Sequence, residues 1–339
     1  MSSRFNSIDA SLLLALQRGL SFESRPFAAL GAKLGLKEEE VLSKAAAFIR
    51  QGLVRRFGAV FDARSLGYDS TLCAVDVPKT RLNRVVAQLK PHKGITHCYL
   101  RSGTPALWFT LTAPAHELGR ELKVIAGLVK PYEVLNLPAR RIFKIGVILD
   151  VRRNDALNSV TPAAARARPV SSRLLIQPSR RVLRKSEREL VRALQRDLPL
   201  VADPFAAVAR ELNFEHNELL ELLRDWQRRG ILRRVGLIPH HRELGFAVNG
   251  MCVWKVAARD IVKAGRSVAR FPHVTHCYER LMPRQFPFNL YAMLHAPGPG
   301  QAEAQKLREC IAAAAGLSGG QMLVSLKEFK KSSPQFFNA

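Results

Sequence analysis

The chain has few cysteines, and their number and spacing exclude a disulfide framework. They are odd in number, widely separated and never in a CxxC pair: Cys73, Cys98, Cys252, Cys277 and Cys310. A secreted disulfide scaffold or a zinc knuckle needs cysteines that are close together and even in number. We therefore expect reduced thiols and a protein of the cytoplasm.

Long apolar runs and acidic residues are also scarce. No run approaches the roughly 20 apolar residues that cross a bilayer, and the first residues lack the pattern of a signal peptide. We therefore expect no membrane contact. The 28 acidic residues stand against 53 lysines and arginines, which gives a net charge of +25. This excess predicts a polyanionic partner: nucleic acid, an anionic surface or a ligand with many carboxylates.

Common catalytic and nucleotide-binding motifs are missing as well. No Walker loop, GxGxxG, HExxH or GxSxG lies where its structural context would require it, so the sequence predicts no nucleotide site. His240 and His241 are adjacent on an expected extended segment. Neighbouring side chains of such a segment point to opposite sides, so no metal site is predicted.

What the chain does have is an internal repeat. PFAA at 26–29 returns at 204–207, RRFG at 55–58 as RRVG at 233–236, LGY at 66–68 as LGF at 244–246, and THCY at 96–99 at 275–278. Each copy follows its original by 178 or 179 positions. Such a constant spacing over a whole half indicates duplication and fusion of one complete unit. A site built from both halves would then carry two copies of each chemical group.

A basic segment separates the halves. From Arg152 to Lys185 there are nine lysines and arginines against Asp155 alone, without helical or strand periodicity. We interpret it as a solvated linker. The predicted division is a winged helix-turn-helix at 1–64, a ferredoxin-like domain at 65–151, a linker at 152–182, a second winged helix-turn-helix at 183–242 and a second ferredoxin-like domain at 243–339. About +17 of the charge remains outside the linker.

Hydrophobic periodicity supports this α+β division. Helices are predicted at 8–17, 26–35 and 37–51, followed by an extended wing at 53–61, and the second half repeats them at 187–195, 204–212, 215–229 and 231–239. The next segments alternate as βαββαβ, the order of a ferredoxin-like domain with an antiparallel sheet. Its closing strand is predicted at 141–148 in the first half and at 322–326 in the second.

A winged helix on a basic chain suggests DNA binding, but the third helix argues against it. It opens with KEEE at 37–40, and its counterpart opens with EHNE at 215–218. Acidic side chains suit a helix N-terminus but are repelled by the phosphates that flank the major groove. The fold can therefore persist without a DNA function.

The repeated THCY segments carry the sharpest candidate site. Strand alternation places His97, Tyr99 and Arg101 on one sheet face. The second half places His276, Tyr278 and Arg280 in the same way. Such a row can transfer a proton, hydrogen-bond and bind a carboxylate. A buried structural histidine is the simpler interpretation of one copy, but retention of the string in both halves favours function.

Further candidates lie near these strands. The pairs Arg55-Arg56 and Arg233-Arg234 begin each wing. They are either solvated charges near a helix end or a carboxylate trap between domains. Trp108, on the strand after the first THCY, is favoured as a core residue. The alternative, a surface that stacks on a ligand, makes it a candidate substrate contact.

With these residues in hand, the chain resembles the fused siroheme decarboxylases of the Lrp/AsnC-like superfamily, the NirD–NirL or AhbA–AhbB kind. The matching segments include RPF at 25–27, EEEVL at 38–42, RRFGAVFD at 55–62, LGYDST at 66–71 and the Thr-His pair at 96–97. The resemblance extends over nearly the whole chain outside the linker. One departure is the residue after each histidine, usually Asn in the family and here Cys98 and Cys277, which puts in doubt any hydrogen bond that the Asn makes.

The resemblance implies a carboxy-lyase that removes carboxyl groups from acetate side chains of siroheme, giving didecarboxysiroheme for heme d1 or heme synthesis. It implies no organic cofactor, and the iron belongs to the substrate. Histidines that matter in the family fall on His97 and His276. We expect one of them to supply the proton, with Tyr99 or Tyr278 orienting it. The candidate carboxylate ligands are Arg55, Arg56, Arg101, Arg233, Arg234 and Arg280.

Two other classes stay open at this point. The first is a DNA-binding regulator of the Lrp/AsnC type, and the second is a tetrapyrrole carrier without turnover. The fused halves are expected to pair as an intramolecular pseudo-dimer, since ferredoxin-like domains of this type commonly pair through their sheets. Association with further decarboxylase subunits or with a second copy also stays open.

Overall fold

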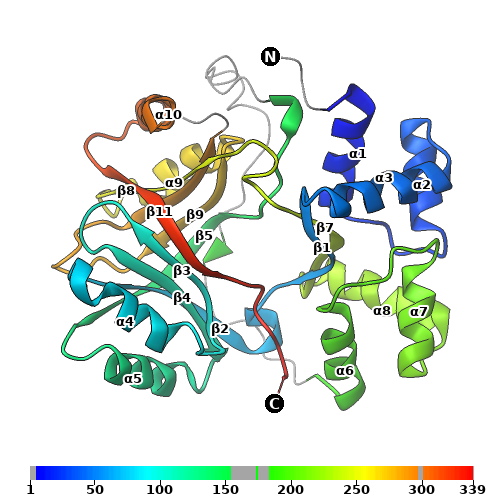
Figure 1. Ribbon diagram of the computed structural model, residues 1–339, viewed down its shortest axis with the longest axis horizontal. Coiled ribbons are helices and arrows are strands. Elements are labelled where there is room, and N and C mark those ends of the chain that lie inside the picture. Colours follow the sequence, from blue (N-terminus) through cyan, green and yellow to red (C-terminus); the bar gives the residue numbers. More distant parts are fainter. Residues whose placement is uncertain (1–4, 154–172, 175–182, 297–300, 339) are drawn as a thin grey trace.

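The computed structural model describes residues 5–153, 173–174, 183–296 and 301–338. It has two parts (Figure 1). A barrel of strands with helices on its outside lies on the left, and a group of helices lies on the right, with a two-stranded ribbon between them. Each part contains elements from both halves of the sequence, so the two copies of the repeat are intertwined rather than arranged end to end.

The helical part contains two copies of a three-helix unit. The elements of the first are α1 (Ser7–Arg18), α2 (Pro26–Leu34) and α3 (Glu38–Arg50), and those of the second are α6 (Lys185–Leu194), α7 (Pro204–Leu212) and α8 (His216–Arg228). All six helices begin and end within two residues of the prediction. Proline stands at the first position of α2 and α7, where its missing N–H costs no hydrogen bond. Gly35 ends α2 in the left-handed conformation.

The two predicted wings pair with each other. Strands β1 (Val54–Phe61) and β7 (Leu232–Pro239) form an antiparallel ribbon with Gly58 opposite Gly236. Helices pack closely on this ribbon, because a Cβ atom on Gly236 would lie 2.4 Å from the carbonyl oxygen of Leu16 in α1. One hydrophobic core joins the ribbon to the helices of both halves.

The ferredoxin-like segments form a single closed barrel. Its strands are β2 (Tyr68–Val75), β3 (Ile95–Arg101), β4 (Leu107–Pro114) and β5 (Val134–Ile145) from the first half, and β8 (Val248–Trp254), β9 (Val274–Arg280), β10 (Leu290–Ala296) and β11 (Gln321–Lys331) from the second. Their order is β2-β4-β3-β11-β8-β10-β9-β5, and β5 pairs back onto β2. The antiparallel pairings β3–β11 and β5–β9 join the two halves, as expected for a pseudo-dimer.

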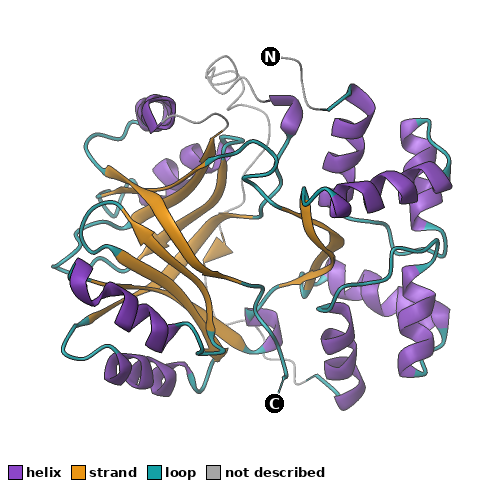
Figure 2. Cartoon of the chain, viewed as in Figure 1, coloured by secondary structure: helices purple, strands orange, loops and turns teal. Residues whose placement is uncertain are grey.

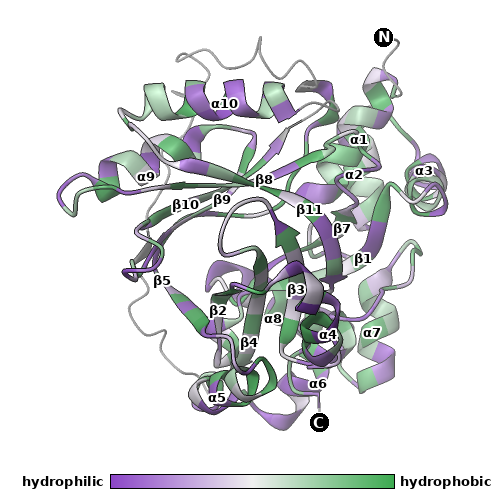
Figure 3. Cartoon of the chain, turned by 60° about the vertical axis from the view of Figure 1, so that its left-hand side comes forward, coloured by the Kyte–Doolittle hydropathy of each residue, from purple (hydrophilic) through white to green (hydrophobic). Residues whose placement is uncertain are grey.

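Helices cover the outside of the barrel. They are α4 (Lys79–Leu89), α5 (Leu118–Leu128), α9 (Ile261–Arg270) and α10 (Gln301–Ala314), and Figure 2 shows them around the strands. Hydrophobic and hydrophilic residues alternate along α10 in Figure 3, as in a helix with one packed face. Each half has its own core between helices and sheet. Short 3-10 turns occur at Arg64–Leu66 and Val151–Arg153.

Three strand predictions need correction. The closing strand of the first half was expected at 141–148 but is β5, which begins at Val134, seven residues earlier. That of the second half was expected to end at 326, whereas β11 continues to Lys331. The linker was predicted without strands, yet Arg173–Leu174 form β6, which pairs with Arg141 and Ile142 of β5. The rest of the predicted linker from 154 to 182 lies outside the described residues.

Candidate functional site

The predicted row of side chains in the first half is assembled on β3. The ring centroids of His97 and Tyr99 are 6.3 Å apart, and the guanidinium carbon of Arg101 lies 5.3 Å from the centroid of Tyr99. Cys98 is buried in the core under α4 and α5, on the other side of the sheet. The alternation predicted from the sequence is confirmed.

The second half repeats this row on β9. The ring centroids of His276 and Tyr278 are 6.1 Å apart, and the guanidinium carbon of Arg280 lies 4.8 Å from the centroid of Tyr278. Cys277 again faces the helices, where its Sγ lies 3.7 Å from the carbonyl oxygen of Gly265 in α9. The cysteines that replace the usual Asn therefore point away from the row of candidate groups.

Both rows face the inside of the barrel. Trp108 lies opposite Tyr99 on β4, and Tyr291 lies opposite Tyr278 on β10. Both belong to an interior apolar cluster with Phe286, Met251, Val253 and Leu323. Trp108 is 1% exposed, and its Nε1 donates a hydrogen bond to the carbonyl oxygen of Pro105. It is therefore a core residue, as favoured from the sequence, and does not offer its face to a ligand.

The histidines lie at one end of the barrel, which we call the barrel mouth. His97 pairs with Lys331 at the end of β11, and His276 pairs with Ile145 at the end of β5. Both imidazoles are half-buried. The β1–β7 ribbon lies at this end, because the Arg55 guanidinium donates to the carbonyl oxygen of Lys331 at 2.7 Å.

Two arginines lie deeper, beyond the tyrosines. Arg101 is 5% exposed and donates to the carbonyl oxygen of Leu323 at 3.1 Å, while half-buried Arg280 donates to that of Leu137 at 2.6 Å. In the described part of the chain neither makes an ion pair with a carboxylate, and the Nε of each is buried without a partner. Burial lowers the pKa of Arg101 to about 10. A buried cation without a counter-charge is costly, so the barrel interior favours an anion.

Strand alternation sends neighbouring arginines of the β1–β7 ribbon to opposite sides. Arg55 is exposed at the barrel mouth, and Arg233 there forms an ion pair with Asp62 at 2.5 Å. Arg56 turns to the helices and donates to the carbonyl oxygens of Gln195 and Ala59, at 3.1 and 3.0 Å.

Arg234, the counterpart of Arg56, donates instead to Val147 at 3.4 Å. Four candidate carboxylate ligands were predicted on this ribbon. The structure brings Arg55 and Arg233 to the histidines, and it turns Arg56 and Arg234 away from them.

Two further histidines lie at the barrel mouth: His295, which the sequence did not single out, and His241, which was considered only as half of a metal pair. The hydroxyl oxygen of Thr275 lies 3.1 Å from Nδ1 of His276 and 3.0 Å from Nδ1 of His295 on β10. The ring of His295 meets that of His241 edge to face at 5.2 Å, and Nδ1 of His241 lies 2.9 Å from Nζ of Lys331. Neither histidine has a counterpart in the first half, so the repeat gave no signal for them.

Burial keeps these imidazoles neutral at pH 7. It lowers the pKa of His97 to about 4, helped by the cations Lys331, Arg55 and Arg101. It lowers the pKa of His276 to about 3, where the nearby His97 also contributes, and the pKa of His241 to about 3. Desolvation disfavours the charged form of an imidazole, and neighbouring cations act in the same direction.

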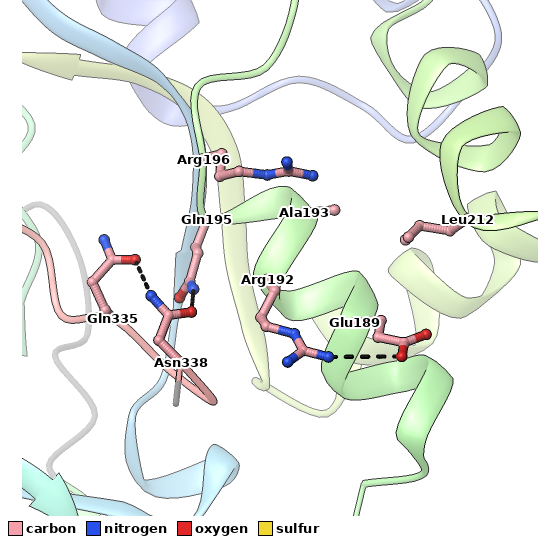
Figure 4. Close-up of a pocket in the computed structure, with 8 residues that line it drawn as sticks. All are labelled: Glu189, Arg192, Ala193, Gln195, Arg196, Leu212, Gln335 and Asn338. Atoms are coloured by element: carbon pink, nitrogen blue, oxygen red, sulfur yellow. Dashed lines mark hydrogen bonds and ion pairs between the residues drawn. The ribbon is translucent and has the colours of Figure 1, made fainter.

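Elsewhere, a cavity of about 370 Å³ opens between α6 and the C-terminal segment (Figure 4). Its charged groups are already paired, Arg192 with Glu189 and Arg196 with Glu211. It contains no histidine or tyrosine, and none of the predicted site residues line it. We therefore place the candidate site at the barrel mouth.

The described residues contain no group of three or more His, Cys, Asp or Glu side chains arranged to hold a metal ion. None of the helices in the same residues is long and apolar enough to cross a membrane.

Comparison with known protein families finds a match for both kinds of domain. The AsnC-like ligand binding domain matches residues 65–144 and 243–330. The siroheme decarboxylase NirDL-like HTH domain matches residues 9–55 and 187–233. Both match once in each half, as the internal repeat predicts.

Similarity also extends over the full length. The siroheme decarboxylase of Hydrogenobacter thermophilus is 33% identical over 340 residues, which cover 100% of this chain and 96% of that protein. A crystal structure of the siroheme decarboxylase NirDL has 30% identity and a TM-score of 0.72, with 98% of this chain and 95% of that one covered. A second NirDL structure, in co-complex with an iron-uroporphyrin III analogue, has 30% identity, a TM-score of 0.69 and coverages of 97% and 95%. The chain belongs to the siroheme decarboxylase family.

Proposed function

We propose that this chain removes CO2 from acetate side chains of siroheme and yields didecarboxysiroheme for heme d1 or heme synthesis. The observation that carries the proposal is the pair of rows His97-Tyr99-Arg101 and His276-Tyr278-Arg280, in which guanidiniums without carboxylate partners lie behind neutral imidazoles. The similar NirDL structure in co-complex with an iron-uroporphyrin III analogue supports a carboxylated iron macrocycle as the substrate.

Binding follows from charge and exposure. A flat macrocycle with carboxylates on its rim needs an apolar surface and cations at the edge. Arg55 is exposed at the barrel mouth and free to bind a carboxylate beyond its one bond to Lys331. Arg233 lies in the same place but is already neutralised by Asp62. Arg101 and Arg280 supply positive potential from below, because each guanidinium is fixed to a backbone carbonyl.

The chemistry needs one proton for each carboxylate lost. When the C–C bond to the carboxylate breaks, CO2 leaves and the bonding electrons stay on the side-chain carbon, which then takes a proton to become a methyl group. His97 and His276 are the groups at the barrel mouth that can deliver it. The carboxylates of a bound substrate raise the pKa of both imidazoles, since opposite charges favour the protonated form. Tyr99 and Tyr278 stack beside the imidazoles and hold their orientation.

No organic cofactor is needed in this scheme, because the macrocycle itself accepts the electron density that the departing CO2 leaves behind. The siroheme iron is part of the substrate. We place the reaction in the cytoplasm, where the buried thiols Cys73, Cys98, Cys252 and Cys277 would stay reduced.

The test is anaerobic incubation of the purified chain with siroheme, followed by mass analysis for loss of CO2. We expect the wild type to release CO2 and His97→Ala and His276→Ala each to slow its release by at least about a hundredfold, the usual effect of removing a general acid. His116→Ala is the matched control, because that side chain is 76% exposed and contacts Glu117 rather than any candidate group. Wild-type rates in both histidine variants would disprove the assignment.

A DNA-binding function is less well supported. Glu38 at the start of α3 is held by Arg25, and Glu40 accepts a hydrogen bond from the backbone N–H of Lys37. These carboxylates stabilise the helix N-terminus but would face the phosphates of a bound duplex. A gel-shift at low salt with upstream DNA should show no specific complex.

A further inference from the structure

Resting on the proposed function, we propose that Thr275 and His295 form a proton path behind His276 that the first half lacks. His276 would be the imidazole resupplied with protons from within the protein, and the two repeated centres would be chemically unequal. Thr275 and His295 act through His276 and are positioning residues rather than catalytic ones.

The hydrogen-bond geometry requires the two imidazoles to share one hydroxyl group. Oγ1 of Thr275 lies 3.1 Å from Nδ1 of His276, 3.0 Å from Nδ1 of His295 and 3.4 Å from the carbonyl oxygen of Met293. A hydroxyl donates one hydrogen bond and accepts two. At least one of the two imidazoles must therefore donate from its Nδ1–H to the oxygen. With the hydroxyl donating to the other imidazole, the three groups form a continuous hydrogen-bonded chain.

A neutral imidazole can act as an acid only if it is reprotonated as it donates. His276 gives its Nε2 proton to the carbon from which CO2 has left and takes a proton at Nδ1 from the Thr275 hydroxyl. The hydroxyl is restored by the Nδ1 proton of His295. No charge is left on His276, which suits a site where burial disfavours the imidazolium form.

His295 must then take a proton at its other nitrogen. Its side chain is 6% exposed and packs edge to face on His241, whose Nε2 is buried without a hydrogen-bond partner. His241 would give its Nε2 proton to His295 and take one at Nδ1 from the Lys331 ammonium, 2.9 Å away. The Lys331 amine then regains its proton from solvent. Burial lowers the pKa of Lys331 to about 8, so this ammonium is acidic enough to give up a proton near neutral pH. Lys331 is half-buried and connects the group to solvent.

The first half provides a control within the same chain. Thr96 also contacts its histidine, with Oγ1 2.9 Å from Nδ1 of His97. The strand register places Thr112, opposite Ser70, where the second half has His295, opposite Asn249. The hydroxyl of Thr112 bonds that of Ser70 at 2.7 Å. In the described residues no second imidazole stands behind Thr96, so the path ends at this hydroxyl.

The test compares Thr275→Val, Thr275→Ser and His295→Gln in the intact chain, with siroheme as substrate. Valine keeps the shape of threonine without its hydroxyl, and serine restores the hydroxyl. We expect Thr275→Val and His295→Gln each to lower kcat by about tenfold or more, with KM within about twofold because both side chains are almost fully buried. Thr275→Ser should recover most of the rate. The double variant Thr275→Val/His295→Gln should be no slower than either single variant, since both interrupt one path.

The matched control is Thr96→Val, which removes the same hydroxyl from a histidine with no imidazole behind it. It should lower kcat less than Thr275→Val, and its solvent deuterium isotope effect should stay that of the wild type. Equal losses in Thr96→Val and Thr275→Val, additive losses in the double variant, or a change confined to KM would each overturn the path. If His295→Gln does not fold, the valine and serine variants decide alone. Absence of CO2 release from the wild type would instead overturn the proposed function.

Discussion

Arg55 and Arg56 are neighbours on β1 but have different surroundings. Arg55 is exposed at the barrel mouth, whereas Arg56 is half-buried and bonds carbonyl oxygens at the end of α6. Cations at a helix C-terminus bind its unpaired carbonyl groups and oppose its dipole. The sequence offers two identical residues here, and only their alternation along the strand decides which of them faces the barrel mouth.

Because the two side chains point to opposite sides of β1, the same substitution should affect substrate binding at Arg55 and stability at Arg56. Arg55→Gln should raise KM for siroheme by roughly fivefold, because about 1 kcal/mol is what one exposed charge-assisted hydrogen bond contributes. Its unfolding midpoint should stay unchanged. Arg56→Gln should lower stability by about 1–2 kcal/mol through two lost hydrogen bonds and leave KM unchanged. Steady-state kinetics and urea unfolding of both variants are the measurements, and a shared phenotype would contradict the assignment.

At the residue scale, the repeat and strand alternation were sufficient to find half of the site. They placed His97, Tyr99 and Arg101 on one face, and the ring contacts confirm that placement. They did not place His295 in the site, and His241 was considered only as a metal ligand, because duplication marks only what both halves retain. Groups that one copy has gained since the fusion need the folded chain to bring them together.

At the scale of elements, the β1–β7 ribbon fixes how closely the helices approach. A Cβ atom on Gly58 would lie 2.8 Å from the carbonyl oxygen of Arg196, and one on Gly236 would lie 2.4 Å from that of Leu16. These two obstacles are backbone atoms, which cannot turn aside as a side chain can; at Gly58 the Arg56 side chain lies closer still, with Nη1 at 2.4 Å. The paired glycines therefore let the helices of both halves lie against one ribbon.

Gly236→Ala should consequently destabilise the protein by about 1–3 kcal/mol, the usual cost of overpacking. Gly127→Ala in α5 is the matched control, since a Cβ atom there meets nothing within 4 Å. That variant should gain up to about 1 kcal/mol from helix propensity. Urea unfolding monitored by circular dichroism measures both. Equal midpoints in the two variants would mean that the ribbon tolerates an added methyl group.

Element boundaries were predictable where periodicity is local and failed where pairing is long-range. Helices with proline starts and glycine ends were predicted within two residues. Strand β5 was predicted seven residues too short at its start, because Pro138 interrupts its alternation. The last residues of β11 read as a charged, exposed run, yet they pair with β3 of the other half. These residues become a strand only because β3 is there to pair with them, and the local sequence does not show that pairing.

At the scale of the whole molecule, the barrel closes only with strands from both halves. Two pairings between halves, β3–β11 and β5–β9, complete it, and the ribbon adds a third. The barrel mouth therefore contains histidines from both copies: His97 from the first, and His241, His276 and His295 from the second. Several of these histidines share the neighbouring cations Lys331, Arg55 and Arg101. Protonation of any one of these histidines therefore places a charge where the strands of the two halves meet.

The free energy of unfolding should therefore fall in mild acid. In the unfolded chain a histidine has a pKa of about 6.5, whereas burial lowers the pKa of His97 to about 4 and of His241 to about 3 in the folded protein. Between these values the unfolded chain binds protons that the folded protein does not, so stability is lost as the pH falls below about 6.5. The slope is of order 1 kcal/mol per pH unit for each such imidazole.

Urea unfolding at pH 7 and pH 5.5 measures this loss. His241→Gln should reduce the difference between the two midpoints, because its imidazole faces Lys331, Arg242, His240 and Arg55 and resists protonation in the folded state. His116→Gln, at a side chain that is 76% exposed, should leave the difference as it is in the wild type. Equal stability at both pH values, or the same slope in both variants, would mean that the imidazoles at the barrel mouth accept protons without cost and that burial does not keep them neutral.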